Sequence, residues 1–507
     1  MCIFKILKNI TKMKYLSALL FSLLFTFSAT AQKDLPTDYL SSDFHKERRD
    51  LLRTKMAKNT VAVFFANAVR NRANDVDYVY HQDPNFYYLT GYKEPHAVLI
   101  IFSDMQEKDG NKYNELLYVQ ERNAMAEMWT GYRLGVEGVK EKLGFDMVFN
   151  GKEFLNSDIN FMTFNNVMFD DFKDDFRDNK RDSADLASLI ESFKTQVGYH
   201  IEEGAPQATE KMRLEMAKEG AIETQRAKID TQTLSTLMGG LRQIKTPEEM
   251  KLLTKAVRIS AIGQVEIMKA MKPNMSETEI QGIHEYVYKK YGSEYEGYPS
   301  IVGAGNNGCV LHYVENNKTH VEGDLVLMDL GAEYHGYTAD VTRTIPASGT
   351  FSPEQKLIYD IVYDAQNAGI EAAIIGNTGA DTDAAGRKII NKRLFELGII
   401  KSENERHLYF PHGTSHHIGL DVHDLNDRSP YQANMVITVE PGIYIPEGSP
   451  CDEKWWGIAV RIEDDILITE NGPINLSAEA PRKSSEIEAL MKQKSALDDF
   501  VLPKLDD

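Results

Sequence analysis

The stretch VLMDLGAEYHGYTADVTRTIP, residues 326–346, places two acidic side chains in a segment that otherwise looks buried. Val326 to Met328 form an apolar run typical of a buried β-strand, and the YHGY sequence around Gly336 is typical of a turn that reverses the chain. If the loop of such a hairpin has an even number of residues, Asp329 and Asp340 share one face, opposite or diagonal to each other. Two carboxylates on neighbouring positions of one sheet face repel each other, so we expect a positive group between them.

Other charged or imidazole side chains lie in segments with the same buried character. ITVEPGIYI places Glu440 at the end of an apolar strand, and GIAVRIEDDILIT places Glu463 in the middle of another, beside Arg461. A single buried Glu beside an Arg is more often a structural ion pair, but the ordered set Asp, Asp, His, Glu, Glu predicts one shared site. Oxygen and imidazole are the ligands that hard or borderline divalent cations select. The candidate imidazoles all come from PHGTSHHIGLDVHD and are His412, His416, His417 and His423.

This order of residues, with its flanking motifs, resembles the pita-bread metallopeptidases, a family that includes methionine aminopeptidase, prolidase and aminopeptidase P. The motifs that carry the resemblance are DLGAEYHGYTADVTRT, HGTSHHIGLDVHD, TVEPGIY, RIEDDILIT and GAGNNGCVLHYVENN. Two further stretches, NDVDYVYHQDPNFYYLTGYKEPHAVL and AEMWTGYRLG, are similar to the N-terminal domain of the aminopeptidase P group. The similarity extends from about Arg48 to Met491, which is nearly the whole chain.

The resemblance implies an α+β fold, in which a pita-bread catalytic domain follows a smaller mixed α/β N-terminal domain. We expect a signal peptide at 1–31, the N-terminal domain at 32–240, the catalytic domain at 241–495 and a tail at 496–507. The boundary is supported by KTPEEMK, in which Thr246 is an N-cap, Pro247 takes the first helical position and Glu249 completes a capping box.

By the same resemblance, two divalent metal ions, with manganese expected, are held by five side chains. Asp329 holds one ion, His416 and Glu440 hold the other, and Asp340 and Glu463 bridge both. Four carboxylates offset the four positive charges of two dications, and the absence of thiols disfavours a structural zinc site. Glu440 is also the expected proton shuttle. The resemblance also implies that His312 and His423 stabilise the tetrahedral intermediate. The residues implied to line the substrate pocket are His412, Tyr444, Arg461 and Trp129.

The implied activity is removal of the N-terminal residue from peptides that have proline in the second position, by a hydroxide that bridges the two ions. Prolidase, which cleaves only Xaa-Pro dipeptides, is the first alternative, and a non-catalytic peptide-binding homologue is the second. The AEMWTGYR block favours the aminopeptidase. The resemblance also implies a homo-oligomer, a dimer or a tetramer, in which Asp75 approaches a neighbouring subunit.

Several residues near these motifs have simpler interpretations. We expect His417 to be a packing residue, His320 and His335 to lie in surface turns, and Asp421 and Asp424 to orient histidines or cap turns. The cysteines that follow the signal peptide are expected to be independent thiols, with Cys309 buried; the second is Cys451.

Composition and the N-terminus limit the class of protein. A length of 507 residues accommodates two or three domains, and 42% hydrophobic with 26% charged residues is typical of globular proteins. A formal charge of −19 argues against a nucleic-acid partner, which needs an excess of Lys and Arg. Four early lysines, the apolar run Tyr15 to Phe27 and the small residues Ala29 and Ala31 are typical of a signal peptide. That run is shorter than the roughly 20 residues of a membrane-spanning helix, so we expect export to a periplasm or out of the cell, without stable membrane insertion after cleavage.

Overall fold

The computed structural model describes residues 36–173, 182–199, 227–500 and 502. The chain divides into two compact units, Met1–Leu40 and Ser41–Asp507. In the first unit, residues 36–40 hold no helix or strand. The predicted signal peptide and residues 503–507 of the predicted tail lie outside the described residues. Over the described ranges, no helix combines the length and the apolar character needed to span a bilayer.

The N-terminal part of the unit Ser41–Asp507 is built on one mixed sheet. Its strands, in spatial order, are β6 (Val148–Asn150), β5 (Asn111–Val119), β4 (Val98–Lys108), β1 (Thr60–Phe65), β7 (Asn166–Met168) and β8 (Ile229–Asp230). Strand β1 pairs antiparallel with β4 and parallel with β7. The apolar faces of these strands pack with Leu189 and Phe193 in one core. This arrangement is the mixed α/β domain that the sequence predicts.

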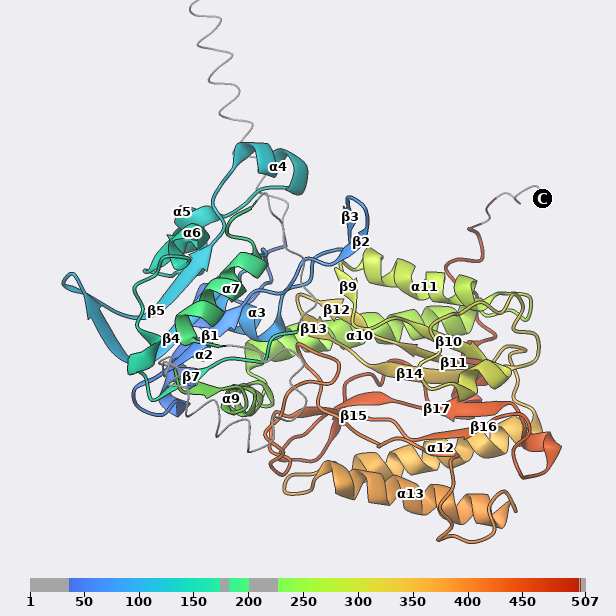
Figure 1. Cartoon of the computed structure of the whole chain (residues 1–507). Coiled ribbons are helices and arrows are strands. Elements are labelled where there is room, and N and C mark those ends of the chain that lie inside the picture. Colours follow the sequence, from blue (N-terminus) through green and yellow to red (C-terminus); the bar gives the residue numbers. More distant parts are fainter. Residues whose placement is uncertain (1–35, 174–181, 200–226, 501, 503–507) are drawn as a thin grey trace, which may run out of the picture. The chain divides into compact units, whose positions relative to one another are not determined.

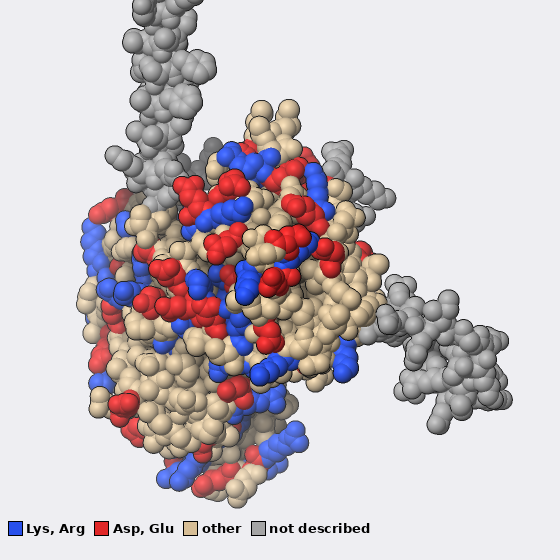
Figure 2. Space-filling model, turned by 90° about the vertical axis from the view of Figure 1, so that its left-hand side faces the viewer, with Lys and Arg blue, Asp and Glu red and all other residues tan. Residues whose placement is uncertain are grey.

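Helices surround this sheet, and two small elements extend from it (Figure 1). The extensions are α4 (Ala124–Thr130) and the hairpin of β2 (Asn71–Ala73) and β3 (Val76–Asp77). Figure 2 shows acidic and basic side chains interspersed over the face on the left of Figure 1. The other helices of this part are α2 (Ser42–Lys55), α3 (Pro84–Thr90), α5 (Gly135–Leu143), α6 (Gly151–Phe154), η1 (Phe161–Thr163), α7 (Leu186–Val197) and α9 (Thr233–Arg242).

The C-terminal part begins with a long helix whose start follows local chemistry. Helix α10 spans Pro247–Ala270, and the predicted capping box is confirmed. The hydroxyl of Thr246 accepts from the amide of Glu249 at 3.2 Å, and the Glu249 carboxylate accepts from the amide of Thr246 at 2.9 Å. Pro247 fits the first helical position because its missing N–H would have no partner there.

Short sheets lie between two helical layers in this part. Figure 1 shows α10 and α11 (Glu277–Lys290) on one side of the strands, and α12 (Pro353–Ala372) and α13 (Gly379–Glu396) on the other. Most of these strands and helices pack in one large apolar core, and a second, smaller core contains Ile437, Val439 and Ile466. One sheet consists of β10 (Ile301–Ala304), β11 (Leu325–Leu330) and β14 (Val341–Pro346), and a second of β13 (Tyr337–Thr338), β12 (Ala332–Tyr334) and β9 (Tyr295–Glu296). A third sheet consists of β15 (Val436–Val439), β18 (Asp464–Leu467) and β19 (Ile474–Asn475). The fourth has two strands, β16 (Gly442–Ile445) and β17 (Ile458–Arg461). The remaining helices are η2 (Gly305–Cys309), η3 (Glu453–Trp455) and α14 (Ser484–Leu490).

The stretch 326–346 forms a nested pair of hairpins. Strand β11 pairs with β14 so that Asp329 faces Thr342, which puts Asp340 on the same face and diagonal to Asp329, as the sequence predicts. Between them, β12 and β13 are joined by a two-residue turn at His335 and Gly336, with φ of 51° and 88°. Such paired positive φ angles are typical of a type I′ turn. The expectation that His335 lies at the surface is wrong, because it is only 2% exposed and bonds to the Glu294 carboxylate.

Candidate metal centre

The five predicted metal ligands come from separate elements and line one cavity of about 640 Å³. Asp329 lies on β11, Asp340 directly before β14, and Glu440 directly after β15, as predicted. His416 comes from the loop between α13 and β15. The sequence predicts Glu463 in the middle of a strand, but the residue lies between two strands. The chain leaves the β16–β17 sheet after Arg461 and joins the β15–β18–β19 sheet at Asp464. The break between the two sheets points Glu463 into the cavity.

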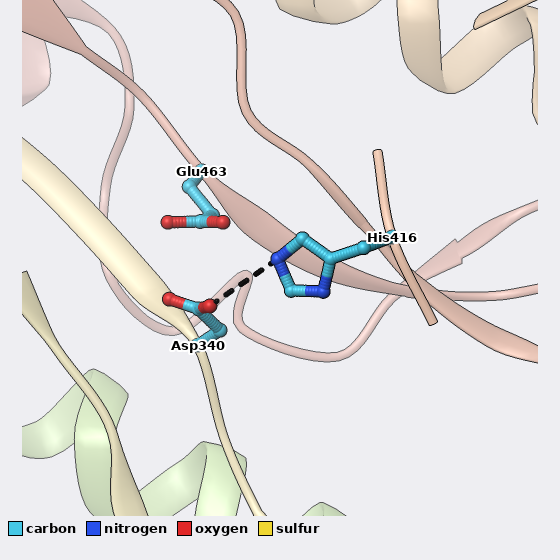
Figure 3. A group of neighbouring side chains, drawn as sticks. All are labelled: Asp340, His416 and Glu463. Atoms are coloured by element: carbon cyan, nitrogen blue, oxygen red, sulfur yellow. Dashed lines mark ion pairs between the residues drawn. The ribbon is translucent and has the colours of Figure 1, made fainter. Parts of the chain in front are cut away.

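Three of these side chains form a compact group. Figure 3 shows the carboxylates of Asp340 and Glu463 facing each other, with the His416 ring directed toward them. One ligand atom of each lies within 4.8 Å of the others. The Nε2 atom of His416 is 3.5 Å from Asp340 and 3.4 Å from Glu440. His416 Nδ1 lies 3.1 Å from the carbonyl of His417 and can donate to it, which leaves Nε2, once deprotonated, as the atom available to a metal ion.

The aspartates are joined by a hydroxyl group. Tyr298 Oη is 2.6 Å from Oδ1 of Asp329 and 2.6 Å from Oδ1 of Asp340. The other oxygen of Asp329 accepts from Arg461 Nη2 at 2.6 Å. Burial and the nearby carboxylates raise the pKa of Tyr298 well above its ordinary value, so the phenol keeps its proton and acts as a donor.

Carboxylates outnumber the cationic groups in this cavity. Burial, and then the neighbouring carboxylates, raise the pKa of Glu463 well above the ordinary value. Burial raises the pKa of Glu440 to about 7. For His416 burial acts to lower the pKa, but Asp340 and Glu440 outweigh it and raise the pKa to about 9. Crowded carboxylates around an imidazole, without a thiol, form a donor set that fits hard or borderline divalent cations.

The residues predicted to line the substrate pocket adjoin the metal ligands through hydrogen bonds. Arg461 Nη1 donates to Tyr444 Oη at 2.9 Å, while the same guanidinium holds Asp329. Tyr444 Oη lies 2.7 Å from His412 Nε2. Burial, and then Arg461, lower the pKa of His412 to about 4, so the ring is neutral and accepts the tyrosine proton. These three side chains are therefore coupled to the candidate metal ligands through Asp329.

The two predicted stabilisers of the tetrahedral intermediate also line the cavity. His312 and His423 are both exposed at its mouth. The His423 ring lies 4.2 Å from that of His416, centroid to centroid. Burial, and then His416, lower the pKa of His423. A neutral His423 keeps one N–H that can be donated to a bound oxygen.

Comparisons with known proteins agree with this geometry. A model of metallopeptidase family M24 matches residues 251–470, and a model of the aminopeptidase P N-terminal domain matches residues 45–163. The Xaa-Pro aminopeptidase of Escherichia coli (strain K12) is 34% identical over 466 residues, covering 89% of this chain and 98% of that relative. The chain belongs to metallopeptidase family M24.

Other M24 relatives are similar over most of the chain. Xaa-Pro aminopeptidase 3 of Homo sapiens is 30% identical, covering 85% of this chain and 81% of the relative. The solved structure of E. coli aminopeptidase P with the inhibitor Pro-Leu matches with a TM-score of 0.76 at 32% identity, covering 89% of this chain and 98% of that one. Proline aminopeptidase P II from Yersinia pestis matches with a TM-score of 0.75 at 32% identity, over 89% and 99% of the two chains. The expected pita-bread domain and separate N-terminal domain are thus confirmed.

One predicted substrate residue of this M24 chain lies outside the cavity. Trp129 is 83% exposed on α4 and is absent from the cavity lining in the part of the chain that the structure describes. Asp75 is likewise exposed, at the turn between β2 and β3. The structure therefore does not bring either residue to the metal centre of its own chain.

The structure agrees only in part with the roles expected for Asp421, Asp424 and His417. Asp421 caps a local turn, since its carboxylate accepts from the amide of His423 at 3.2 Å. Among the described residues, the Asp424 carboxylate bonds to no histidine; it is buried between Arg242 and Lys245 and accepts from the amide of Leu425 at 2.9 Å. His417 is buried near Tyr431, in agreement with a packing role.

Cys309 and Cys451 are free thiols, as predicted. Cys309 is half-buried rather than buried.

Two residues that bond to the candidate metal ligands were not predicted from the sequence. Tyr298 precedes β10 in an irregular segment, and no periodicity marks it as facing Asp329 and Asp340. Thr342 did carry a signal, because it alternates with Asp340 and therefore shares its face. Its hydroxyl donates to Glu463 at 2.6 Å and accepts from Arg461 Nε at 3.3 Å.

Proposed function

We propose that this protein is a metal-dependent Xaa-Pro aminopeptidase, which releases the N-terminal residue from peptides with proline in the second position. The observation that carries the proposal is Arg461, whose guanidinium bonds both to Asp329 and to Tyr444. It links the acidic cluster to the His412–Tyr444 pair, the expected proline pocket. The names of the E. coli and human relatives support the same substrate class.

We assign two divalent ions, with Mn²⁺ preferred, to the cavity. Asp329 would hold one ion, His416 and Glu440 the other, and Asp340 and Glu463 both. The buried carboxylates, the position of His416 Nε2 beside Asp340 and Glu440, and the charge balance support this assignment. When bound, such ions supply Lewis acidity that activates water at neutral pH and polarises the scissile carbonyl.

The chain's own residues perform the remaining tasks. His312 and His423 donate hydrogen bonds to the oxygen that becomes negative as the carbonyl carbon turns tetrahedral. Glu440 accepts the proton that the attacking water loses and passes it to the departing proline nitrogen. Arg461 and His412 fix Tyr444, and the buried face of this group excludes water from the proline ring.

Two alternatives remain to be distinguished from this function. A prolidase would use the same cavity but accept only dipeptides, and the aminopeptidase names of the relatives favour the longer substrates. A non-catalytic homologue is disfavoured, because all five ligand side chains line the cavity. We further propose export to a periplasm or out of the cell and assembly into a dimer or tetramer, on the grounds of the N-terminal sequence and the family resemblance respectively.

The test uses the chain from Gln32, stripped of metal and then supplied with Mn²⁺. Cleavage of an Xaa-Pro-Yaa tripeptide is followed beside that of the matching Xaa-Pro dipeptide, with Glu463→Ala as the inactive control. Release of Xaa from the tripeptide that depends on Mn²⁺ is the expected result. Cleavage of the dipeptide alone would identify a prolidase, and no cleavage of either would refute the peptidase function.

A further inference from the structure

The loop that carries His312 is fixed by hydrogen bonds to buried polar groups. The loop follows η2, and Leu311, His312 and Val314 line the cavity, whereas Tyr313 and Asn316 are buried. Tyr313 packs with Leu327 and Tyr444 in a small apolar cluster. The position of His312 is therefore set by where its neighbour Tyr313 is anchored.

The anchor is a buried carboxylate on another element. Glu277, the first residue of α11, is fully buried and accepts four hydrogen bonds from neutral donors. Oε2 accepts from Tyr313 Oη at 2.9 Å and from the amide of Lys318 at 2.8 Å, at the two ends of the His312 loop. Oε1 accepts from the amide of Ala304 at 2.7 Å and from Asn307 Nδ2 at 3.0 Å. One oxygen thus holds the loop and the other holds the β10–η2 segment.

A second anchor connects the same loop to the strand beside the metal ligands. Asn316 accepts from the amide of Val302 at 2.9 Å and donates to the carbonyl of Ser300 at 2.8 Å. Both partners flank Ile301, which pairs with Asp329 across β10 and β11. The loop is consequently tied to the strand beside Asp329 at Asn316, and to Glu277 on either side of that residue, at Tyr313 and Lys318.

We propose that Glu277 is a positioning residue for His312, acting through Tyr313 and the main chain at Lys318. This inference rests on the role proposed above for His312. A buried carboxylate that accepts four bonds at normal distances fixes its donors more strongly than a neutral acceptor does. Replacing it by an amide puts an NH₂ group against donors that need an acceptor, so the loop shifts and His312 moves out of reach of the substrate oxygen.

A double-mutant cycle in the Mn²⁺-loaded full chain tests the proposal. In the parent protein, Glu277→Gln should lower kcat for the tripeptide about 10- to 100-fold, as small misplacements of a catalytic group do. KM and metal content should stay within about two-fold, since the ligands and the proline pocket are untouched. In a His312→Ala background the same change should alter kcat by less than about two-fold, because the group it positions is gone.

Two further variants complete the design. Tyr313→Phe removes only the hydroxyl that Glu277 accepts and should repeat the pattern of Glu277→Gln, so it carries the cycle if Glu277→Gln does not fold. Glu279→Gln removes an equal charge from the same turn of α11 at an exposed position and should leave kcat unchanged.

An equal loss of kcat in both backgrounds, or no loss in a folded Glu277→Gln or Tyr313→Phe variant, would overturn the positioning role while leaving the proposed function intact. A parent protein that does not cleave the tripeptide would overturn both.

Discussion

Replacing Asp424 by alanine should destabilise the protein, because it leaves two buried cations without their anion. The Asp424 carboxylate contacts Arg242 Nη2 and lies 3.0 Å from Lys245 Nζ. All three side chains are at most 3% exposed. The group connects the loop that carries His416 and His423 to the end of α9 and the start of α10.

The magnitude follows from the charges that remain. Removing one partner of a buried ion pair costs about 3–5 kcal/mol. Arg242 keeps a bond to Asn85 and Lys245 keeps one to the carbonyl of Arg242, so we expect the lower end, about 3 kcal/mol. Lys245→Met should cost less, about 1 kcal/mol, because it leaves a balanced pair of Arg242 and Asp424.

The assay is equilibrium unfolding in urea at a fixed Mn²⁺ concentration, read as a change in midpoint at constant m-value. Asp427→Ala is the control, since Asp427 is an exposed carboxylate of the same loop, and should cost no more than about 1 kcal/mol. A loss from Asp424→Ala below about 1 kcal/mol, or an equal loss from Lys245→Met, would refute the reasoning from net buried charge.

Three further results are expected. Glu463→Ala should lose both bound metal and activity, measured by elemental analysis and tripeptide cleavage; an active variant would refute the assigned site. His423→Ala should lower kcat about 10²–10³-fold with metal content unchanged, as loss of one oxyanion donor does, and loss of metal would instead make His423 a ligand. Burial lowers the pKa of His45 to about 4 and that of His284 to about 3, so both take up protons on unfolding at acidic pH. The contribution of these two histidines to the free energy of unfolding should therefore be complete above about pH 6.5 and fall toward pH 4, by up to about 1.4 kcal/mol per pH unit for each histidine. Urea midpoints across this range measure that slope, which His284→Asn should reduce; a flat profile would contradict the burial argument.

Features set by neighbouring residues could be predicted from the sequence. The capping box at Thr246 and Glu249 needs only four consecutive positions, and the shared face of Asp329 and Asp340 follows from the two-residue period of strands. The ligand set was predicted because polar groups in apolar runs are conspicuous and their order resembles a known family. The domain limits at residues 32–240 and 241–495 stay predictions.

Features set by distant partners could not be predicted. The run around Glu463 looks like one strand, since periodicity does not reveal that its two halves pair with different sheets. Burial of His335 depends on Glu294, 41 positions away, and the pairing of Asp424 depends on Arg242, 182 positions away. Tyr298 offers no pattern at all, because its role depends on a contact made only in the folded state.

The same long separations shape how the protein reaches its native state. Arg461 meets Asp329 across 132 positions, and Glu463 meets Thr342 across 121. Contacts of this kind form late, because the entropy of closing each long loop must be lost before the contact stabilises anything. The proposed ions draw their ligands from segments that lie far apart in the sequence, so the unfolded chain offers no such site. Metal binding therefore does not start the folding of this chain. Because the ions would bind only the native state, they would stabilise the folded protein relative to the unfolded chain.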